Sequence, residues 1–278
     1  MTVEKIGEES PLSWEEFKKL AKENELIAKE QRAKAENKAE YSDWIYRGHS
    51  CAKWKLETTL ERFLEKELDN KNKNLKVREY YQYLNQIIPA INANTSYKFS
   101  FINFEELGSL KRSSKLPHYE LLCLTRHLGF PSPLLDWTES YYIAAFFAFR
   151  NADKCKNVAI YSYKEWNGNA RGGWVGEPMM NEHGPYVETH PRHYKQQSHY
   201  TPCIKTIDDT LYFTNPEEAA NDESGSHNLK KYYLQGTQKD EVLSDLFSMN
   251  INDYTLFGDE ESLMRMLAFK EIKLPNID

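Results

Sequence analysis

Two separate stretches of the chain combine residue types that could bind a ligand or take part in chemistry. They are Tyr46-Arg47-Gly48-His49 and the run HLGFPSPLLDWTESYYIAAFFA at 127–148. Arg47 offers five donors in a planar fork, which suits a phosphate, a carboxylate or a dinucleotide. Gly48 beside it would let a ligand approach the backbone closely. The structural alternative is an Arg47–Asp136 salt bridge that ties the two stretches together.

The second stretch places a lone carboxylate, Asp136, beside Trp137 and Thr138. In a ligand site Trp137 could provide a stacking contact to a base. In a purely structural reading, Asp136 or Thr138 caps the helix that begins near Glu139, and Trp137 fills the core. Thr138 is expected to act as a cap rather than as a nucleophile.

A third stretch, 183–199, holds half of the eight histidines. A zinc set drawn from His190, His193, His199 and Cys203 matches no standard ligand spacing, so no metal is predicted. Histidines titrate near neutral pH and could instead serve as general acid and base. Gln197 is expected at the start of a strand, either facing a groove or making a structural hydrogen bond.

Local patterns predict the elements that must position these residues. The Ser13-Trp14-Glu15-Glu16 capping box predicts a helix to about Lys38, and a short strand at 44–46 would deliver Arg47 to its end. Apolar spacing predicts a buried helix over 75–92 and a shorter helix over 118–126 that Gly129 ends. Strands are predicted at 158–163, 200–205 and 211–214, a long loop at 164–190, and helices at 238–248 and 260–269.

Composition sets the class of protein. The chain has 278 residues, 40% of them hydrophobic, which suits one domain with a sizeable core. Its formal charge of −6 provides no global positive field for nucleic acid, although a local basic patch stays open. Four widely spaced cysteines predict reduced thiols and a cytoplasmic protein. The chain has no leader-like start and no stretch of ~20 apolar residues, so no membrane partner is expected.

The motifs resemble the FRG domain, which takes its name from a Phe/Tyr-Arg-Gly motif. The similarity is carried by Tyr46-Arg47-Gly48, Trp54, Arg62, His127-x-Gly129-x-Pro131, Leu134-Leu135-Asp136-Trp137-Thr138, Ala144 and Phe147-Ala148. It is expected to run from the first helix to the LFGDEESLMRML segment, nearly the whole chain. His49 replaces the family's usual Gln, and Ser132-Pro133 replaces a polar pair. The segment 191–201 resembles the family's Arg…Gln-Gly-x-Phe block, with Ser198 in place of glycine. The resemblance implies a bacterial or phage-associated protein, in a family without a settled activity.

The aromatic-Arg-Gly strand end also resembles the first motif of arginine-type ADP-ribosyltransferases. This implies NAD as substrate, held by Arg47, with Asp136 and Thr138 ordering the ribose. Gln197 or Glu188 would steady the oxocarbenium-like transition state. That family's Ser-Thr-Ser and Glu-x-Glu strands are absent from the sequence.

Two other classes of function remain open. One is a non-catalytic nucleotide- or nucleic-acid-sensing module that uses arginine and aromatic contacts. The other is a metal-independent RNA-cleaving effector that uses His127, His193 or His199. A bacterial toxin or phage-defence role would fit each class, with an antitoxin or other regulatory protein as partner.

We predict an α+β fold in a single domain, 1–278, with a small, mostly antiparallel central sheet covered by helices, and ADP-ribosyltransferase-like as one arrangement. The candidate catalytic residues are Arg47, Asp136, Thr138, Gln197 and Glu188. The candidate ligand-binding residues are Tyr46, Gly48, His49, Trp54, His127, Trp137, Arg192, His193, His199 and Tyr200.

Overall fold

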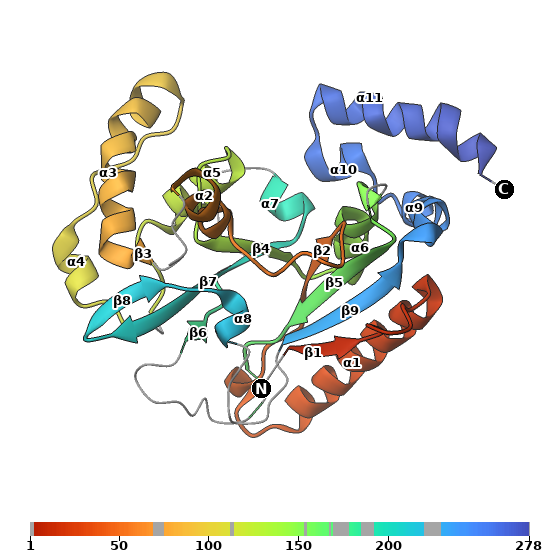
Figure 1. The fold of residues 1–278 in the computed structure, drawn as a ribbon, viewed down its shortest axis with the longest axis horizontal. Coiled ribbons are helices and arrows are strands. Elements are labelled where there is room, and N and C mark those ends of the chain that lie inside the picture. The colour runs from red at the N-terminus through yellow and green to blue at the C-terminus, as the bar shows by residue number, and fades with distance from the viewer. Residues whose placement is uncertain are drawn as a thin grey trace.

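A computed structural model describes residues 3–68, 75–111, 114–152, 155–166, 168, 178–184, 192–219 and 229–277. Within these residues nine strands form one sheet in the order β1-β9-β5-β2-β4-β7-β8-β3, with β6 paired to β7 (Figure 1). The strands are β1 Glu4–Ile6, β2 Ile45–His49, β3 Leu75–Lys76, β4 Leu134–Thr138, β5 Asn157–Tyr163, β6 Met179–Met180, β7 Ser198–Ile207, β8 Thr210–Phe213 and β9 Leu229–Gln235.

Helices cover the sheet, and short helical turns extend two of its connections and the C-terminus. The α-helices are α1 Trp14–Lys34, α2 Thr59–Leu68, α3 Val77–Asn94, α4 Phe104–Gly108, α5 Tyr119–His127, α6 Tyr141–Phe149, α7 Arg192–Lys195, α8 Pro216–Ala219, α9 Lys239–Ser248, α10 Asp253–Phe257 and α11 Glu260–Ala268. The turns are η1 Lys38–Glu40, η3 Gly236–Gln238, η4 Phe269–Lys273 and η5 Leu274–Asn276. In Figure 1, α3 and α4 lie at one end of the molecule, and α1 lies beside β9 and β1 at the other.

The sheet is weakest where it joins β2 to β4. These two strands share one register pair, Tyr46↔Thr138, whereas β2 and β5 run together from Ile45↔Tyr163 to His49↔Ala159. β4 is likewise paired with β7 along its length, from Leu134 to Thr138. The strands β2 and β4, which carry the two sequence motifs, therefore separate after one paired position. Side chains occupy the space between them beyond that position.

Three groups of buried side chains form the core. One group packs α1, α6 and α9 on β5 and β9, and a second packs α3 and α5 on β7 and β8. The third lies on the opposite face of the central strands and includes Leu135, Trp137 and Tyr161. Helix α6 is apolar throughout and buried, because it crosses directly over β2. Among the described residues, no helix combines the length and apolarity needed to cross a bilayer.

Gly48 is required by this packing. A Cβ atom at position 48 would lie 2.0 Å from the Ala144 carbonyl oxygen and 2.6 Å from the Ala148 nitrogen. The glycine therefore lets α6 approach β2, which is a different reason from the ligand approach expected from the sequence.

The α+β class and the mostly antiparallel sheet covered by helices are confirmed, with β1–β9 as a parallel exception. The capping box at Ser13 starts α1, Gly129 has the left-handed φ of +89°, and α3, β5, β7 and α11 form where predicted. The long-loop prediction at 164–190 falls largely outside the described residues, although β6 forms within it.

The predicted cap of α6 was wrong. Asp136 and Thr138 both belong to β4, and the hydroxyl of Ser140 accepts the hydrogen bond from the Ile143 N–H at the start of α6. The sequence offered several capping side chains within five residues. Pairing with β7 extends the backbone through Thr138, so the helix can begin only after it.

The prediction of four reduced thiols was also wrong. Cys51 and Cys155 form a disulfide, with their Cα atoms 5.3 Å apart, whereas Cys123 and Cys203 are buried free thiols. Because β2 and β5 are antiparallel neighbours, the chain just after β2 and the chain just before β5 meet. A separation of 104 residues hid this proximity from sequence reasoning.

Candidate functional site

Arg47 and Asp136 meet at the gap between β2 and β4. Nη1 of Arg47 donates a 2.7 Å hydrogen bond to the main-chain oxygen of Asp136 and lies 3.8 Å from its Oδ2. Nε of Arg47 donates to Nε2 of His49 at 3.2 Å. The Arg47 side chain is 14% exposed and that of Asp136 38% exposed. The two motifs predicted to cooperate are therefore in direct contact, and the Asp136 side chain is partly exposed.

A second arginine, which sequence reasoning missed, is the main partner of this carboxylate. Arg126 donates through Nε to both Asp136 oxygens at 3.0 and 3.1 Å, and through Nη2 to Oδ2 at 2.6 Å. Its Nη1 donates to the hydroxyl of Thr59 at 3.0 Å, which ties it to α2. The available signal was the position of Arg126 at the end of a predicted helix, directly before His127.

Positive charge exceeds negative charge here. Burial alone would raise the pKa of the Asp136 carboxyl, but Arg126 and then Arg47 hold that pKa at about 2. Burial is the largest effect that lowers the pKa of Arg47 to about 10, with Asp136 opposing it and Arg126 adding to it. Partial burial and then the charge of Arg126 also lower the pKa of Arg62. One carboxylate thus pairs with two guanidinium groups, an arrangement suited to an anionic ligand.

A buried tyrosine links two histidines beside this charge cluster. Tyr200 lies opposite Asp136 in the register of β7 and β4. Its hydroxyl lies 2.6 Å from Nε2 of His127 and 2.8 Å from Nδ1 of His193. The two imidazole centroids are 4.5 Å apart. A hydroxyl has one proton to donate, so at most one imidazole can accept from Tyr200 and at least one must donate to it. The three groups form an ordered proton chain next to Arg126.

His49 contacts Arg47, and its ring in turn lies beside two aromatic rings, those of Trp54 and Tyr161. The ring of His49 lies 6.2 Å from that of Trp54 and 5.0 Å from that of Tyr161. Burial, followed by the charge of Arg47, lowers the pKa of His49 well below its usual value. This agrees with the hydrogen bond from Arg47, because only a neutral imidazole nitrogen can accept it.

His199 forms a separate cluster. Its Nε2 and Nδ1 each lie 2.7 Å from a carboxylate, on Glu139 and Glu182 respectively. Burial works against charge on the ring, but the hydrogen bonds that the ring donates to Glu182 and Glu139 outweigh it and raise the pKa of His199. Gln197 is exposed just before β7, with a left-handed φ of 48°, and its carbonyl accepts from the Glu139 N–H at 3.1 Å.

The remaining predicted residues have structural contacts. Tyr46 and Trp137 are buried, and the Trp137 indole donates to the hydroxyl of Thr201 at 2.8 Å. Thr138 is 4% exposed, and its hydroxyl accepts from the Ser140 N–H. Arg192 pairs with Asp259 at 2.6 Å. Glu188 lies outside the described residues.

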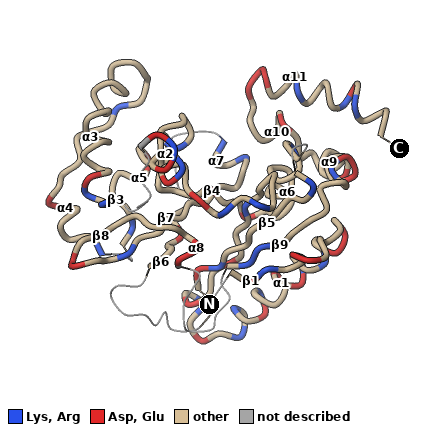
Figure 2. The backbone as a smooth tube through the Cα atoms, viewed as in Figure 1, with Lys and Arg blue, Asp and Glu red and all other residues tan. Residues whose placement is uncertain are grey.

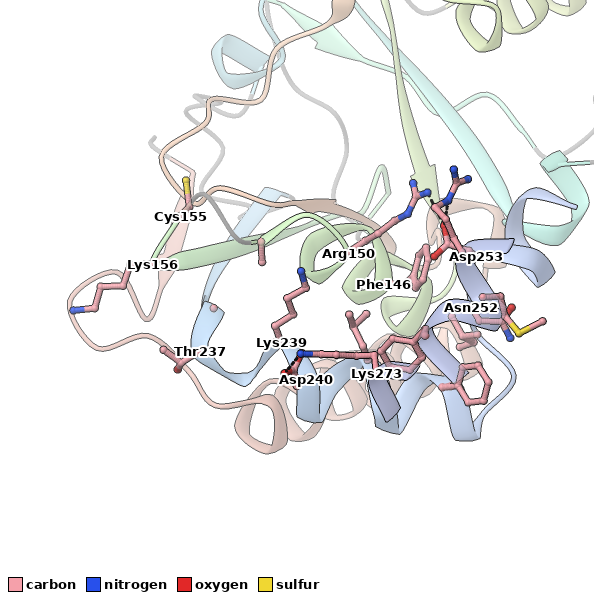
Figure 3. Close-up of a pocket in the computed structure, with 18 residues that line it drawn as sticks. Phe146, Arg150, Cys155, Lys156, Thr237, Lys239, Asp240, Asn252, Asp253 and Lys273 are labelled. Carbon is pink, nitrogen blue, oxygen red and sulfur yellow. Dashed lines mark hydrogen bonds and ion pairs between the residues drawn. The ribbon is translucent and has the colours of Figure 1, made fainter. Parts of the chain in front are cut away.

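A different cavity, of about 580 Å³, lies between α6, α9 and α11 (Figure 3). Its charged groups largely satisfy one another: Asp253 is 2.5 Å from Arg150 and 3.0 Å from Arg265, and Asp240 is 2.6 Å from Lys273. None of the predicted site residues that the structure describes lines this cavity. The Arg47–Asp136 cluster is therefore distinct from it.

Comparison with known proteins places the motifs in a family. Residues 42–157 match the profile of the FRG domain, so the chain contains an FRG domain over that span. The match includes Arg47, Arg126, His127 and Asp136 but ends before β7, which is narrower than the resemblance expected from the sequence. No curated protein and no solved structure matches the chain.

Proposed function

We propose that the FRG domain of this chain binds the phosphates of a nucleotide with Arg47 and Arg126, and that the nucleotide is NAD. The observation that carries the proposal is the convergence of these guanidinium groups on a single carboxylate that remains 38% exposed. Arginine forks bind phosphate oxygens bidentately. A dinucleotide phosphate would replace part of the pairing that Asp136 now supplies.

The reaction that follows from this binding is ADP-ribosyl transfer or NAD hydrolysis. Asp136 would then accept hydrogen bonds from a ribose. The hydroxyl of Thr138 is engaged by Ser140, which leaves Thr138 a supporting role. The backbone N–H of Glu139 bonds to the Gln197 carbonyl at the turn before β7, and Gln197 and the half-exposed carboxylate of Glu139 are the candidates on this turn to steady a developing positive charge.

The test is NAD binding by calorimetry together with nicotinamide release by the purified full chain. Arg47→Ala should weaken NAD binding by about tenfold or more, because a charge-assisted pair is worth at least ~1.4 kcal/mol. Arg47→Lys should recover part of the loss. Arg32→Ala, which removes an exposed arginine paired with Asp43, is the matched control and should change nothing. Unchanged NAD binding in a folded Arg47→Ala protein would reject the proposal.

The histidine pair supports a second candidate, metal-independent RNA cleavage. His127 and His193, joined through Tyr200 and next to Arg126, have the general acid, general base and phosphate-binding groups that this reaction needs. Cleavage of single-stranded RNA in EDTA should occur and be lost in His127→Ala and His193→Ala. His118→Asn, at a left-handed position outside the cluster, is the control. Nucleotide binding without turnover of NAD or RNA would instead favour a sensing module.

An effector, toxin or phage-defence role would follow from either activity. Induced expression of the wild-type chain should then slow bacterial growth, and Arg47→Ala should relieve the effect at equal protein levels. Equal toxicity of the two proteins would argue against a role that depends on this site.

A further inference from the structure

A cavity of about 860 Å³ opens where the loop after β2 meets β1 and β9. Its size is within the range of nucleotide and cofactor sites. Five lysines and an exposed tryptophan line it: Lys5, Lys53, Lys55, Lys156, Lys231 and Trp54. This is a local concentration of positive charge on a chain whose formal charge is −6.

Lys231 is the most unusual of these residues because it is only 7% exposed. Its Nζ donates to the Trp54 carbonyl at 3.2 Å and lies 5.0 Å from the Tyr161 ring centroid and 5.1 Å from that of Tyr233. It makes no ion pair with any described residue. Burial, as the largest effect, lowers the pKa of this amine. The charge of Glu217 opposes this effect, but Glu217 lies beyond ion-pairing distance, so the buried ammonium group is only partly compensated and an anion in the cavity would supply the missing charge.

The two carboxylates of the cavity wall, Glu217 and Glu8, already have hydrogen-bond or ion-pair partners. Glu217 accepts from the Leu56 N–H at 2.9 Å and from the Tyr161 hydroxyl at 3.4 Å. Glu8 pairs with Lys5 at 2.7 Å.

Four of the lysines thus remain without an ion pair in the described part of the chain: Lys53, Lys55, Lys156 and Lys231. In Figure 3, Lys156 lies far from the Arg150–Asp253 pair and points away from it.

Trp54 supplies an aromatic surface at the mouth of the cavity. It is 54% exposed, although tryptophan usually buries most of its area. The disulfide between Cys51 and Cys155 holds the 51–55 loop against the start of β5, and both cysteines line the cavity. An exposed ring on a restrained loop, surrounded by lysines, is the arrangement that stacks nucleobases while cations hold the phosphates.

The cavity residues Lys5 and Lys231 lie on the same face of the sheet as Arg47. In the register of the sheet, Arg47 lies opposite Tyr161 and Tyr161 lies opposite Lys231. Lys231 in turn lies opposite Lys5, so these four residues form one row across β2, β5, β9 and β1. Directly paired residues project from the same face of a sheet. In Figure 2 the basic positions of β1 and β9 lie next to each other.

We propose that this cavity is a second site, separate from the Arg47–Asp136 cluster, that binds a nucleobase on Trp54 and its attached phosphates on Lys231, Lys53, Lys55 and Lys156. The ligand is a free nucleotide or a segment of single-stranded nucleic acid. The site requires neither NAD binding nor catalysis at Arg47.

The test is fluorescence anisotropy of the full chain with a labelled single-stranded RNA oligonucleotide, with ATP and AMP as unlabelled competitors. Trp54→Ala should weaken binding by at least fivefold, since a stacked base contributes about 1–3 kcal/mol. Lys231→Gln should also weaken binding by at least fivefold, because it removes a cation that holds the phosphates. Trp166→Ala removes another partly exposed tryptophan and should have no effect. The double variant Lys53→Gln/Lys55→Gln should weaken binding and reduce its salt dependence, and these exposed positions avoid the risk of misfolding at Lys231.

Competition identifies the source of the ligand. Displacement by ATP at concentrations comparable to the oligonucleotide indicates a free nucleotide, and weak displacement indicates a strand. Arg47→Ala should leave this binding intact, so failure of the NAD proposal and failure of this one are distinguishable. The proposal is overturned if neither ligand binds at low salt, or if Trp54→Ala and the double lysine variant bind as tightly as the wild type.

Discussion

At the scale of single residues, Asp136 holds two arginines in place through different atoms. Arg126 makes three side-chain hydrogen bonds to its carboxylate, whereas Arg47 relies on its main-chain oxygen and a longer contact. This difference separates the two arginines in role. Arg126 is the main partner that orients the carboxylate, and Arg47, which makes fewer hydrogen bonds to Asp136, is the arginine more easily redirected to a ligand phosphate.

Replacement of Arg126 should therefore cost more stability than replacement of Arg47. We expect Arg126→Gln to lower the free energy of unfolding by about 2 kcal/mol, because several charge-assisted hydrogen bonds are lost. Arg47→Gln should cost less, since the Asp136 carboxylate keeps its main partner. Urea denaturation of the two variants provides the comparison, and an equal or reversed order would contradict it.

His199 should make the stability of the folded protein depend on pH. Its pKa in the folded state is raised above the ordinary 6.5, so its contribution to stability is present below pH 6.5 and is lost as pH rises through the folded pKa. His183 acts in the opposite direction, between about pH 4 and 6.5, because burial lowers its pKa to about 4.

Unfolding free energies measured above pH 6.5 should consequently fall with pH in the wild type. The fall should be shallower in His199→Gln, which cannot carry the charge that Glu139 and Glu182 stabilise. Identical slopes for the two proteins would show that this cluster does not hold a proton as the geometry implies.

At the scale of elements, the site depends on how closely α6 approaches β2. Gly48 lies against the backbone of α6, and the strand continues into the loop that carries Trp54. Any side chain at position 48 would push the helix away and displace Arg47 beside it.

Gly48→Ala should lower the free energy of unfolding by roughly 3 kcal/mol or more, or prevent folding, because the new methyl would overlap backbone atoms that cannot move independently. Gly108→Ala is the control, since a Cβ there meets nothing within 4 Å. Thermal melts of both variants test the prediction, and a tolerated Gly48→Ala would mean that β2 and α6 are farther apart in solution.

At the scale of the whole molecule, the disulfide joins segments that are 104 residues apart in sequence. It closes a loop that contains α2 to α6 and the strands β3 and β4. Such a long loop restricts the unfolded chain strongly, by about 4–5 kcal/mol in the chain-entropy description.

A reducing agent should accordingly lower the melting temperature of the wild type, and Cys51→Ser should lower it by the same amount under oxidising conditions. Cys51→Ser itself should be insensitive to the reducing agent. A wild-type melting temperature that does not change on reduction would show that the bond contributes no stability, or that it does not form in solution.

Sequence alone determined many of the local elements and the two motifs. Apolar spacing predicted α3, and the Ser13 capping box predicted the start of α1. The FRG motifs indicated Arg47 and Asp136 as candidate site residues. These features are readable because helix and strand periods and caps depend on residues within a few positions of one another. β1, α2 and β9 were missed because their short or mixed patterns gain their conformation from neighbouring strands or helices.

Tertiary structure alone decided which distant groups meet. The partnership of Arg126 with Asp136, the Tyr200 bridge between two histidines, the Cys51–Cys155 bond and the lysine cavity around Trp54 all join segments from different strands and helices. Strand order fixes these contacts, and it depends on long-range burial of the whole core rather than on local preference. For this reason the sequence predicted a contact between Arg47 and Asp136, whereas the fold determined how much of each side chain is exposed to a ligand.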